Sequence, residues 1–283
     1  MKIIKLDRDN RSVNTLGYRL KFKPTSINTK IDDGLLNKFI REYRERRYRE
    51  KIRNFKGIKI VSKGDSWFQF PFVLKDTIDI LSDEYAILSL DTVGDTLENM
   101  VATDEITQAI ERENPDIFLI SGGGNDMFVN GVFLSWLTPF ESNLKPEKYL
   151  NENFNHFVDK ITHLYGGLFT KLSHQYPEIR IVCHGYDYII PRKAPFGIFM
   201  GNNMQERGII DRDLQREIMK IVIDRLNNAQ IDLVSRFPNR VFHVDCRNAV
   251  NTNDWIDEIH PNSDGFKSLA NRFRIVIDNI VKF

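Results

Sequence analysis

The sequence predicts an α/β fold, a three-layer α/β/α sandwich built on a flavodoxin-like sheet of five parallel strands, with a basic helical extension at the N-terminus. Short β-branched runs alternate with longer segments of helical period from residue 57 onward, a pattern typical of βαβ units. The charge also changes there, because residues 1–56 hold 17 basic and 7 acidic side chains whereas residues 57–283 carry a net charge of −9. We therefore expect two parts, an extension over 1–56 and an α/β domain over 57–283.

The expected elements follow from the apolar runs and their period. We expect strands over 58–62, 85–90, 116–121, 178–184 and 240–244. We expect helices between and after them over 71–82, 103–114, 151–176, 209–237 and 263–282, with an irregular insertion over 131–150. Right-handed crossovers would place these helices on both faces of the sheet. Ligands bind such sheets beyond the carboxyl ends of the strands, so the residues that follow each strand are the candidates for a site.

The extension has a different character. Residues 35–55 have helical period, with Glu42–Arg46 and Glu45–Arg49 pairs four residues apart, a spacing that supports a helix. Residues 38–56 hold 9 basic and 3 acidic side chains with Tyr43, Tyr48 and Phe55 between them. Three partners suit this arm: the acidic body of the same chain, which we favour, an anionic lipid surface or a nucleic acid.

Several classes of protein are excluded by composition. With 283 residues, 41% hydrophobic and 28% charged, the chain is neither fibrous nor wholly disordered and can bury a sizeable core. No apolar stretch approaches the roughly 18 to 20 residues of a membrane-spanning helix, and charged residues near the start argue against a signal peptide. Cys183 and Cys246 are the two cysteines, too few for a disulfide framework or a CxxC pair. We therefore expect a cytoplasmic protein without a spanning segment.

Three of the expected strands end in residues that suit chemistry. Gly64-Asp65-Ser66 would place a serine hydroxyl at the edge of the sheet, Gly94 follows the second strand, and Gly123-Gly124-Asn125-Asp126 follows the third. Asn125 can aim an N–H at an oxyanion. Each motif alone has a simpler reading as a turn or helix cap. A phosphate cradle is disfavoured because neither Gly-x-Gly-x-x-Gly nor Gly-Lys-Ser/Thr is present.

A histidine and an acid follow the fifth strand. Asp257 and His260 are three residues apart, so the carboxylate can reach the imidazole and fix its tautomer, leaving the other ring nitrogen free to act as a base. Asp254 competes for the same orienting role. A His-Pro pair before a helix is otherwise an ordinary boundary.

These motifs, in this order, resemble the SGNH hydrolase superfamily, also called GDSL esterases and lipases, over about residues 58–283. The resemblance implies an SGNH-type hydrolase domain that cleaves carboxylic esters or thioesters without a metal or organic cofactor. It implies Ser66 as the nucleophile, His260 as the general base and Asp257 as its orienting acid. The oxyanion hole would consist of the Ser66 and Gly94 N–H groups and the Asn125 side chain. The Gly-x-Ser-x-Gly elbow of α/β-hydrolases is absent, which disfavours that competing fold.

Aromatic residues near the strand ends are candidates for binding a small or lipid-like ester. We select Trp67, Trp136, Tyr186 and Phe196 as substrate-binding residues. The apolar and irregular loop 185–208 is a lid candidate, and His184 could contact substrate or be a core histidine bonded to Asp187 or backbone. Two alternatives to an ester hydrolase stay open, an acyltransferase that uses the same triad and a non-catalytic binding module on the same fold.

Overall fold

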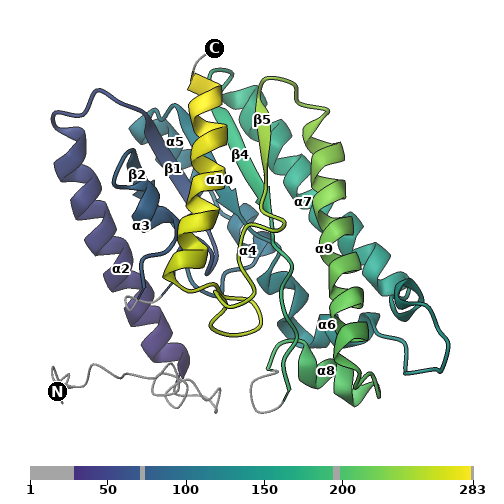
Figure 1. Cartoon of the computed structure of the whole chain (residues 1–283). Coiled ribbons are helices and arrows are strands. Elements are labelled where there is room, and N and C mark those ends of the chain that lie inside the picture. Colours follow the sequence, from purple (N-terminus) through teal and green to yellow (C-terminus); the bar gives the residue numbers. More distant parts are fainter. Residues whose placement is uncertain (1–28, 71–73, 194–197, 282–283) are drawn as a thin grey trace, which may run out of the picture.

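A computed structural model describes residues 29–70, 74–193 and 198–281, and it has the predicted three-layer α/β/α architecture (Figure 1). The five-stranded sheet has the order β2-β1-β3-β4-β5, and all of its strand pairs are parallel. The strands are β1 (Lys59–Gly64), β2 (Ala86–Ser89), β3 (Ile117–Ser121), β4 (Arg180–Gly185) and β5 (Val241–Asp245). Each lies within two residues of its prediction. β2 and β3 are buried along their whole length, as expected for strands covered on both faces.

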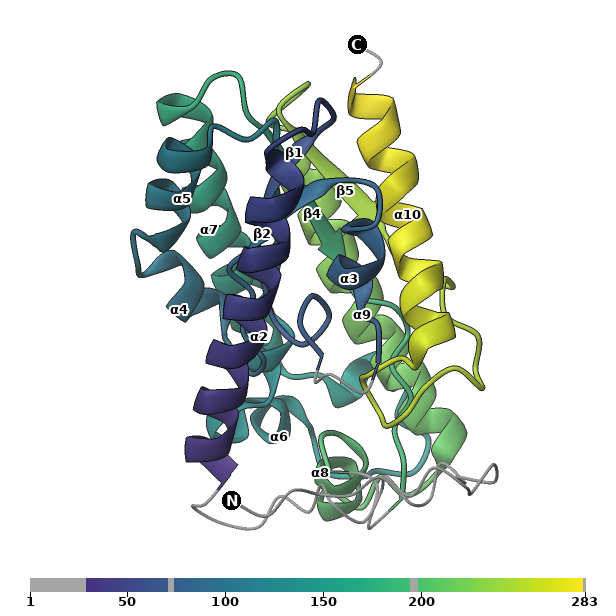
Figure 2. The same cartoon turned by 90° about the vertical axis from the view of Figure 1, so that its left-hand side faces the viewer.

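Helices cover both faces of this sheet. α3 (Thr77–Leu81) and α10 (Ser263–Val281) pack together on one face, while α4 (Leu97–Val101), α5 (Glu105–Glu113), α7 (Glu152–Gln175) and α9 (Arg212–Val234) cover the other (Figures 1 and 2). The long helices begin at polar caps, because the Asn151 and Asp211 side chains accept N–H groups of the first turns of α7 and α9. Such caps satisfy amides that have no partner within the helix.

Three predictions of local structure need correction. The helix expected over 71–82 spans Thr77–Leu81 within the described residues, because Asp76 and Asp79 form a capping box that starts it there; residues 71–73 lie outside the described chain. The insertion over 131–150 is not wholly irregular. It contains α6 (Val132–Trp136) and the 3-10 turn η3 (Pro146–Tyr149), and another 3-10 turn, η2 (Val129–Gly131), leads into it. The loop 185–208 likewise contains α8 (Gly201–Glu206).

The basic extension contributes α2 (Thr29–Ile52), which runs along the β2 edge of the sheet (Figure 2). Ile40 and Tyr48 of this helix are buried in the protein. The Arg44 side chain is also buried and forms ion pairs with Asp76 and Asp79. The rest of the extension, residues 1–28, lies outside the described chain. Among the helices within the described ranges, none is long and apolar enough to cross a membrane.

Candidate active site

Ser66 lies on a tight turn directly after β1. Asp65 organises this turn: its carboxylate accepts the Trp67 N–H at 3.0 Å, and its carbonyl accepts the N–H groups of Phe68 and Gln69. The Asp65 N–H donates to the carbonyl of Ser121 at the end of β3. The turn is therefore tied to the neighbouring strand and places Ser66 at the carboxyl edge of the sheet.

Ser66, His260 and Asp257 form one continuous chain of hydrogen bonds. The Ser66 Oγ lies 2.9 Å from His260 Nε2, and His260 Nδ1 lies 2.7 Å from Asp257 Oδ2. The other Asp257 oxygen accepts the backbone N–H groups of Ile259 and His260, both at 2.8 Å. The carboxylate therefore holds both the ring of His260 and the backbone that carries it. This is the arrangement that lets a histidine remove a proton from a serine.

The charge state of Asp257 suits this arrangement. Burial alone would raise the pKa of the carboxyl, but the His260 charge and the hydrogen bonds to the carboxylate outweigh it, so the pKa lies below the usual range. Asp254, the alternative, is engaged elsewhere: its oxygens accept the side-chain amides of Asn251 at 2.9 Å and Asn262 at 3.3 Å. Of the two acids, Asp257 is the one that contacts His260.

The segments that carry Gly94 and Asn125, the other predicted oxyanion-hole residues, are hydrogen-bonded beside the turn that carries Ser66. The Thr92 N–H donates to the carbonyl of Gly64 at 2.8 Å, and the Asn125 Nδ2 donates to the carbonyl of Asp95 at 2.8 Å. Gly94 lies between these two ties with a φ of 80°, a backbone angle that favours glycine. Within the described part of the chain, the backbone N–H groups of Ser66 and Gly94 donate to no protein acceptor.

Buried polar side chains lie directly under the turn that carries Ser66. The Asp65 carboxylate accepts the hydroxyls of Ser121 at 2.8 Å and of Tyr186, and the Tyr186 oxygen accepts the Gly124 N–H at 3.0 Å. His184 Nε2 lies 2.8 Å from Ser121 Oγ, and its Nδ1 faces the carbonyl of Gly185. Burial raises the pKa of Asp65 to about 6 and lowers the pKa of His184 to about 3. His184 is therefore a neutral core histidine bonded to Ser121 and backbone, and its partner is not Asp187.

The predicted substrate-binding residues fall into three groups. Trp67 and Tyr186 line a small hollow beside Ser66, together with Asn125 and apolar side chains, namely Met127, Phe128, Ile189 and Ile259. Trp136 is fully buried against Phe133, Phe154 and Phe157, away from that hollow, so it has no surface to offer a ligand. Phe196 lies outside the described residues.

Glu258, between the two predicted catalytic residues, has a role that the sequence analysis missed. Its fully buried carboxylate accepts four backbone N–H groups, those of Arg192, Phe199, Met200 and Gly201, at 2.6 to 3.0 Å. Burial raises its pKa although these N–H groups oppose the rise. The loop 185–208 is thus tied to the loop that carries His260. The sequence offered one indication of this role, the position of Glu258 next to Asp257. A carboxylate that is buried at such a position needs hydrogen-bond donors.

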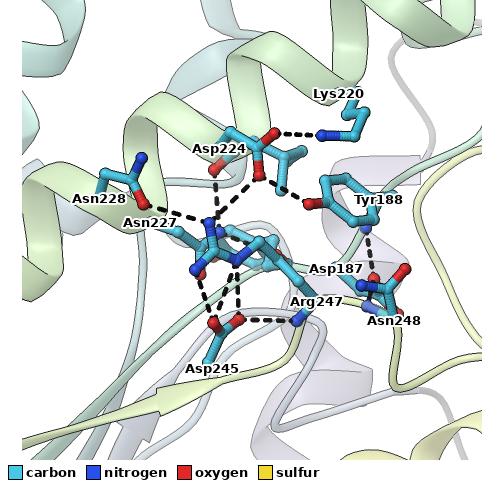
Figure 3. A network of polar contacts seen from close by, with 11 residues as sticks. Asp187, Tyr188, Lys220, Asp224, Asn227, Asn228, Asp245, Arg247 and Asn248 are labelled. Carbon is cyan, nitrogen blue, oxygen red and sulfur yellow. Dashed lines mark hydrogen bonds and ion pairs between the residues drawn. The ribbon is translucent and has the colours of Figure 1, made fainter.

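A second polar network joins the loops that follow β4 and β5 (Figure 3). The Asp187 carboxylate accepts the N–H groups of Asn248 at 2.6 Å and Val250 at 2.7 Å. Arg247 pairs with Asp245 and with Asp224 of α9 (Figure 3). The first residues of the segment that leads from β5 to His260 are therefore fixed by Asp187 and Asp224. Within the described residues, no three His, Cys, Asp or Glu side chains are grouped so as to hold a metal ion.

Several solved structures are similar to this chain in fold. Solved structures with this fold include the lipase Lip_vut3 from a goat rumen metagenome (13% identity, TM-score 0.52, 77% of this chain and 97% of that chain covered). Others are an extracellular lipase from Streptomyces rimosus (12%, 0.51, 77% and 99%) and phospholipase A1 from Streptomyces albidoflavus (12%, 0.52, 79% and 99%).

These similarities confirm the predicted three-layer α/β/α fold. No protein-family model matches the chain, and a search of the curated proteins finds no match either.

Proposed function

We propose that this protein is a serine-dependent hydrolase of carboxylic esters or thioesters, with Ser66 as nucleophile, His260 as general base and Asp257 as the acid that orients His260. The observation that carries the proposal is the continuous hydrogen-bond chain from Ser66 Oγ through His260 to Asp257 at the carboxyl edge of the sheet. The lipases among the solved structures of this fold support the same class of reaction.

The reaction follows from this geometry in two steps. Ser66 Oγ attacks the acyl carbonyl while His260 Nε2 takes the hydroxyl proton, and the imidazolium is stabilised by the Asp257 carboxylate. The tetrahedral intermediate collapses, the proton passes from His260 to the leaving alcohol or thiol, and an acyl-enzyme remains. Water then attacks the acyl group with His260 again as the base, which releases the acid and restores Ser66.

The oxyanion would be held by the N–H groups of Ser66 and Gly94 and by the Asn125 side chain. Support comes from the unpaired state of the first two N–H groups within the described chain. The Asn125 side-chain amide donates one N–H to the Asp95 carbonyl and has a second N–H that can donate to the oxyanion. Removing one such donor costs about 2.7 to 4 kcal/mol of transition-state stabilisation in measured cases. The apolar lining beside Ser66 favours an ester with an apolar acyl group.

The first test is loss of the nucleophile. Ser66→Ala is expected to abolish hydrolysis of a short p-nitrophenyl ester, because no other group takes up the acyl chain, while thermal unfolding stays close to that of the parent protein. A fluorophosphonate probe should add one label to the parent protein and none to Ser66→Ala. The control is Ser235→Ala, an exposed serine at the end of α9. Turnover retained by Ser66→Ala would refute the proposal.

Two alternatives make different predictions with the same protein. An acyltransferase would use the same triad but pass the acyl group to an added alcohol, so the products would contain a new ester in place of the free acid. A non-catalytic binding module would leave Ser66 unlabelled by the probe. The hydrolase is preferred because the serine, the base and the orienting acid are all present and in contact.

We further propose that residues 57–283 form the hydrolase domain and that the basic arm 1–56 docks on this acidic body. Contacts of α2 support docking: Arg49 pairs with Glu113 at 2.7 Å, and Arg41 pairs with Glu105. Tyr48 donates its hydroxyl to Glu113 at 3.0 Å. An anionic surface as the partner of the arm is the alternative.

A further inference from the structure

Asn37 of α2 reaches the loop that follows β2. Its Oδ1 accepts the Val93 N–H at 3.1 Å, and its Nδ2 makes a longer contact of 3.5 Å with the Val93 carbonyl. The same Oδ1 accepts Gln69 Nε2 at 2.6 Å. One side chain from the N-terminal helix therefore joins two segments of the site, the nucleophile turn that carries Gln69 and the loop that carries Gly94.

The Val93 contacts determine the direction of the Gly94 N–H. A peptide unit is planar and trans, so the Val93 carbonyl and the Gly94 N–H belong to one rigid plane and point in opposite directions. Holding the Val93 N–H and carbonyl thus aims the Gly94 N–H away from α2. That N–H has no acceptor within the described chain.

Without Asn37, the Val93–Gly94 peptide would be free to rotate within the loop, because the contact with Asn37 is what holds the Val93 carbonyl. Gly94 has a positive φ of 80°, and a Cβ placed on it would meet no atom within 4 Å. Side-chain packing therefore does not restrain the peptide, and glycine has the widest choice of backbone angles. The other contacts of this loop lie on either side of the Val93–Gly94 peptide. The Thr92 N–H donates to Gly64, the Asp95 N–H donates to the Thr92 carbonyl at 3.2 Å, and Asp95 is held by the Asn125 side chain and by Lys63.

A second contact of the same helix supports the nucleophile turn. Arg44, two turns further along α2, donates from Nη1 to the Phe68 carbonyl at 2.9 Å. Phe68 and Gln69 follow Ser66 closely in the chain. α2 therefore contacts the backbone beside the nucleophile as well as the backbone beside Gly94.

We propose that Asn37 is a positioning residue for the oxyanion hole, so that the N-terminal helix completes the active site rather than only stabilising the fold. This inference rests on the proposed function. An N–H that is aimed before the reaction stabilises the charge that develops on the carbonyl oxygen more than it stabilises the bound ester. Loss of Asn37 therefore acts on kcat and leaves KM nearly unchanged.

The test uses the full chain with Asn37→Leu, Asn37→Asp and a control on the same helix, Arg49→Ala. Leucine has a similar size but makes no hydrogen bond, whereas aspartate keeps the acceptor for Val93 and Gln69. Arg49→Ala removes the contact with Glu113, which lies at the end of α5, and leaves the Val93 loop untouched. The measurements are kcat and KM for a p-nitrophenyl ester, the rate of fluorophosphonate labelling and the midpoint of thermal unfolding.

Asn37→Leu should lower kcat and the labelling rate by about tenfold, less than the loss of a donor itself, with KM within about twofold. Asn37→Asp should recover most of this loss, and Arg49→Ala should keep the parent kcat. An unchanged kcat in Asn37→Leu, or an equal fall in Arg49→Ala, would overturn the inference; if the leucine variant does not fold, Asn37→Ser is read in the same way. A parent protein that the probe does not label at Ser66 would instead refute the proposed function.

Discussion

The turn that carries Ser66 is supported by buried polar residues whose protonation states are set by their surroundings. Asp65 carries the hydrogen bonds that shape the turn, and Ser121 connects it to His184. His184 is fully buried and stacks on the rings of Trp67 and Phe68. Because a charged imidazole would lose its hydration there, burial lowers the pKa of His184 to about 3.

The buried histidine makes stability depend on pH in a defined direction. Below a pH of about 6.5, His184 binds a proton in the unfolded chain but stays neutral in the folded chain. The free energy of unfolding therefore has its full value above that pH and falls by about 1.4 kcal/mol per pH unit toward pH 3. Between pH 7 and pH 5, the free energy of unfolding of the parent protein should therefore fall about 2 kcal/mol more than that of His184→Gln. Urea unfolding at both pH values measures this.

The matched control for that comparison is His174→Gln, at the exposed end of α7. It should have the same pH dependence as the parent protein. A His184→Gln protein whose stability falls with pH as steeply as the parent would contradict the buried neutral state of this histidine.

At the scale of single elements, α2 is joined to the sheet through a buried cation. Arg44 lies among Asp76, Asp79 and Asp91, and two of these, Asp76 and Asp91, have no exposed surface. The acids hold the pKa of the guanidinium above its ordinary range although burial alone would lower it. One Oδ of Asp91 has no hydrogen-bond partner in the described structure. The charges of Arg44 and Lys63 and the hydroxyls of Ser89 and Ser62 oppose the cost of burying this carboxylate.

Removing that cation should be costly. Arg44→Met leaves the buried Asp76 carboxylate without its counter-charge and Asp91 with the charge of Lys63 alone, and we expect a loss of about 3 to 5 kcal/mol in the free energy of unfolding. Denaturant unfolding measures it. The control, Arg47→Met, removes an exposed pair with Asp83 at 3.9 Å and should change stability by less than about 1 kcal/mol. Similar losses in both variants would contradict the buried ion-pair account.

The loop 185–208 depends on one acid in the same way. Glu258→Gln replaces an oxygen by an amide that donates, so at least one of the four N–H groups loses its acceptor. We expect a loss of about 1 to 3 kcal/mol, measured by denaturant unfolding. Glu206→Gln, at an exposed position of α8, is the control. If Glu258→Gln and Glu206→Gln had the same free energy of unfolding, the role given to Glu258 would be refuted.

At the scale of the whole molecule, the near-neutral charge conceals two opposite parts. The net charge of +1 is the sum of a basic first 56 residues and an acidic remainder. Arg41, Arg44 and Arg49 of α2 form ion pairs with acidic side chains of that remainder. A chain cut before Gly57 would lose all three cations together with the buried Ile40 and Tyr48.

The truncation of residues 1–56 tests whether the two parts are separable. We expect the shortened chain to be poorly soluble or to unfold at a clearly lower temperature than the full chain, because it exposes apolar surface and leaves buried acids unpaired. Thermal unfolding and the soluble yield measure this. If the truncated protein were as stable as the full chain but had lost binding to anionic vesicles, the arm would serve a surface and docking would be wrong.

Local sequence signals were sufficient for the sheet and for part of the site. The strands follow from β-branched apolar runs, and the contact between Asp257 and His260 follows from their spacing within one turn. The short helices α6 and α8 were missed because five or six residues leave too little period to detect. The start of α3 has a local cause as well, since Asp76 and Asp79 have the three-residue spacing of a capping box.

Contacts across long separations could be decided only by the tertiary structure. Ser66 and His260 are 194 residues apart, Asn37 and Val93 are 56 apart, and Glu258 meets amides 57 to 66 residues away. Such partners have no periodicity, since they depend on which strand ends the sheet order brings together. By itself the sequence determined the strands, the long helices, the charge division and the Asp257–His260 pair, because these are local in the chain. Folding decided which side chains hold the site, because burial leaves each polar group dependent on the partner that packing places beside it.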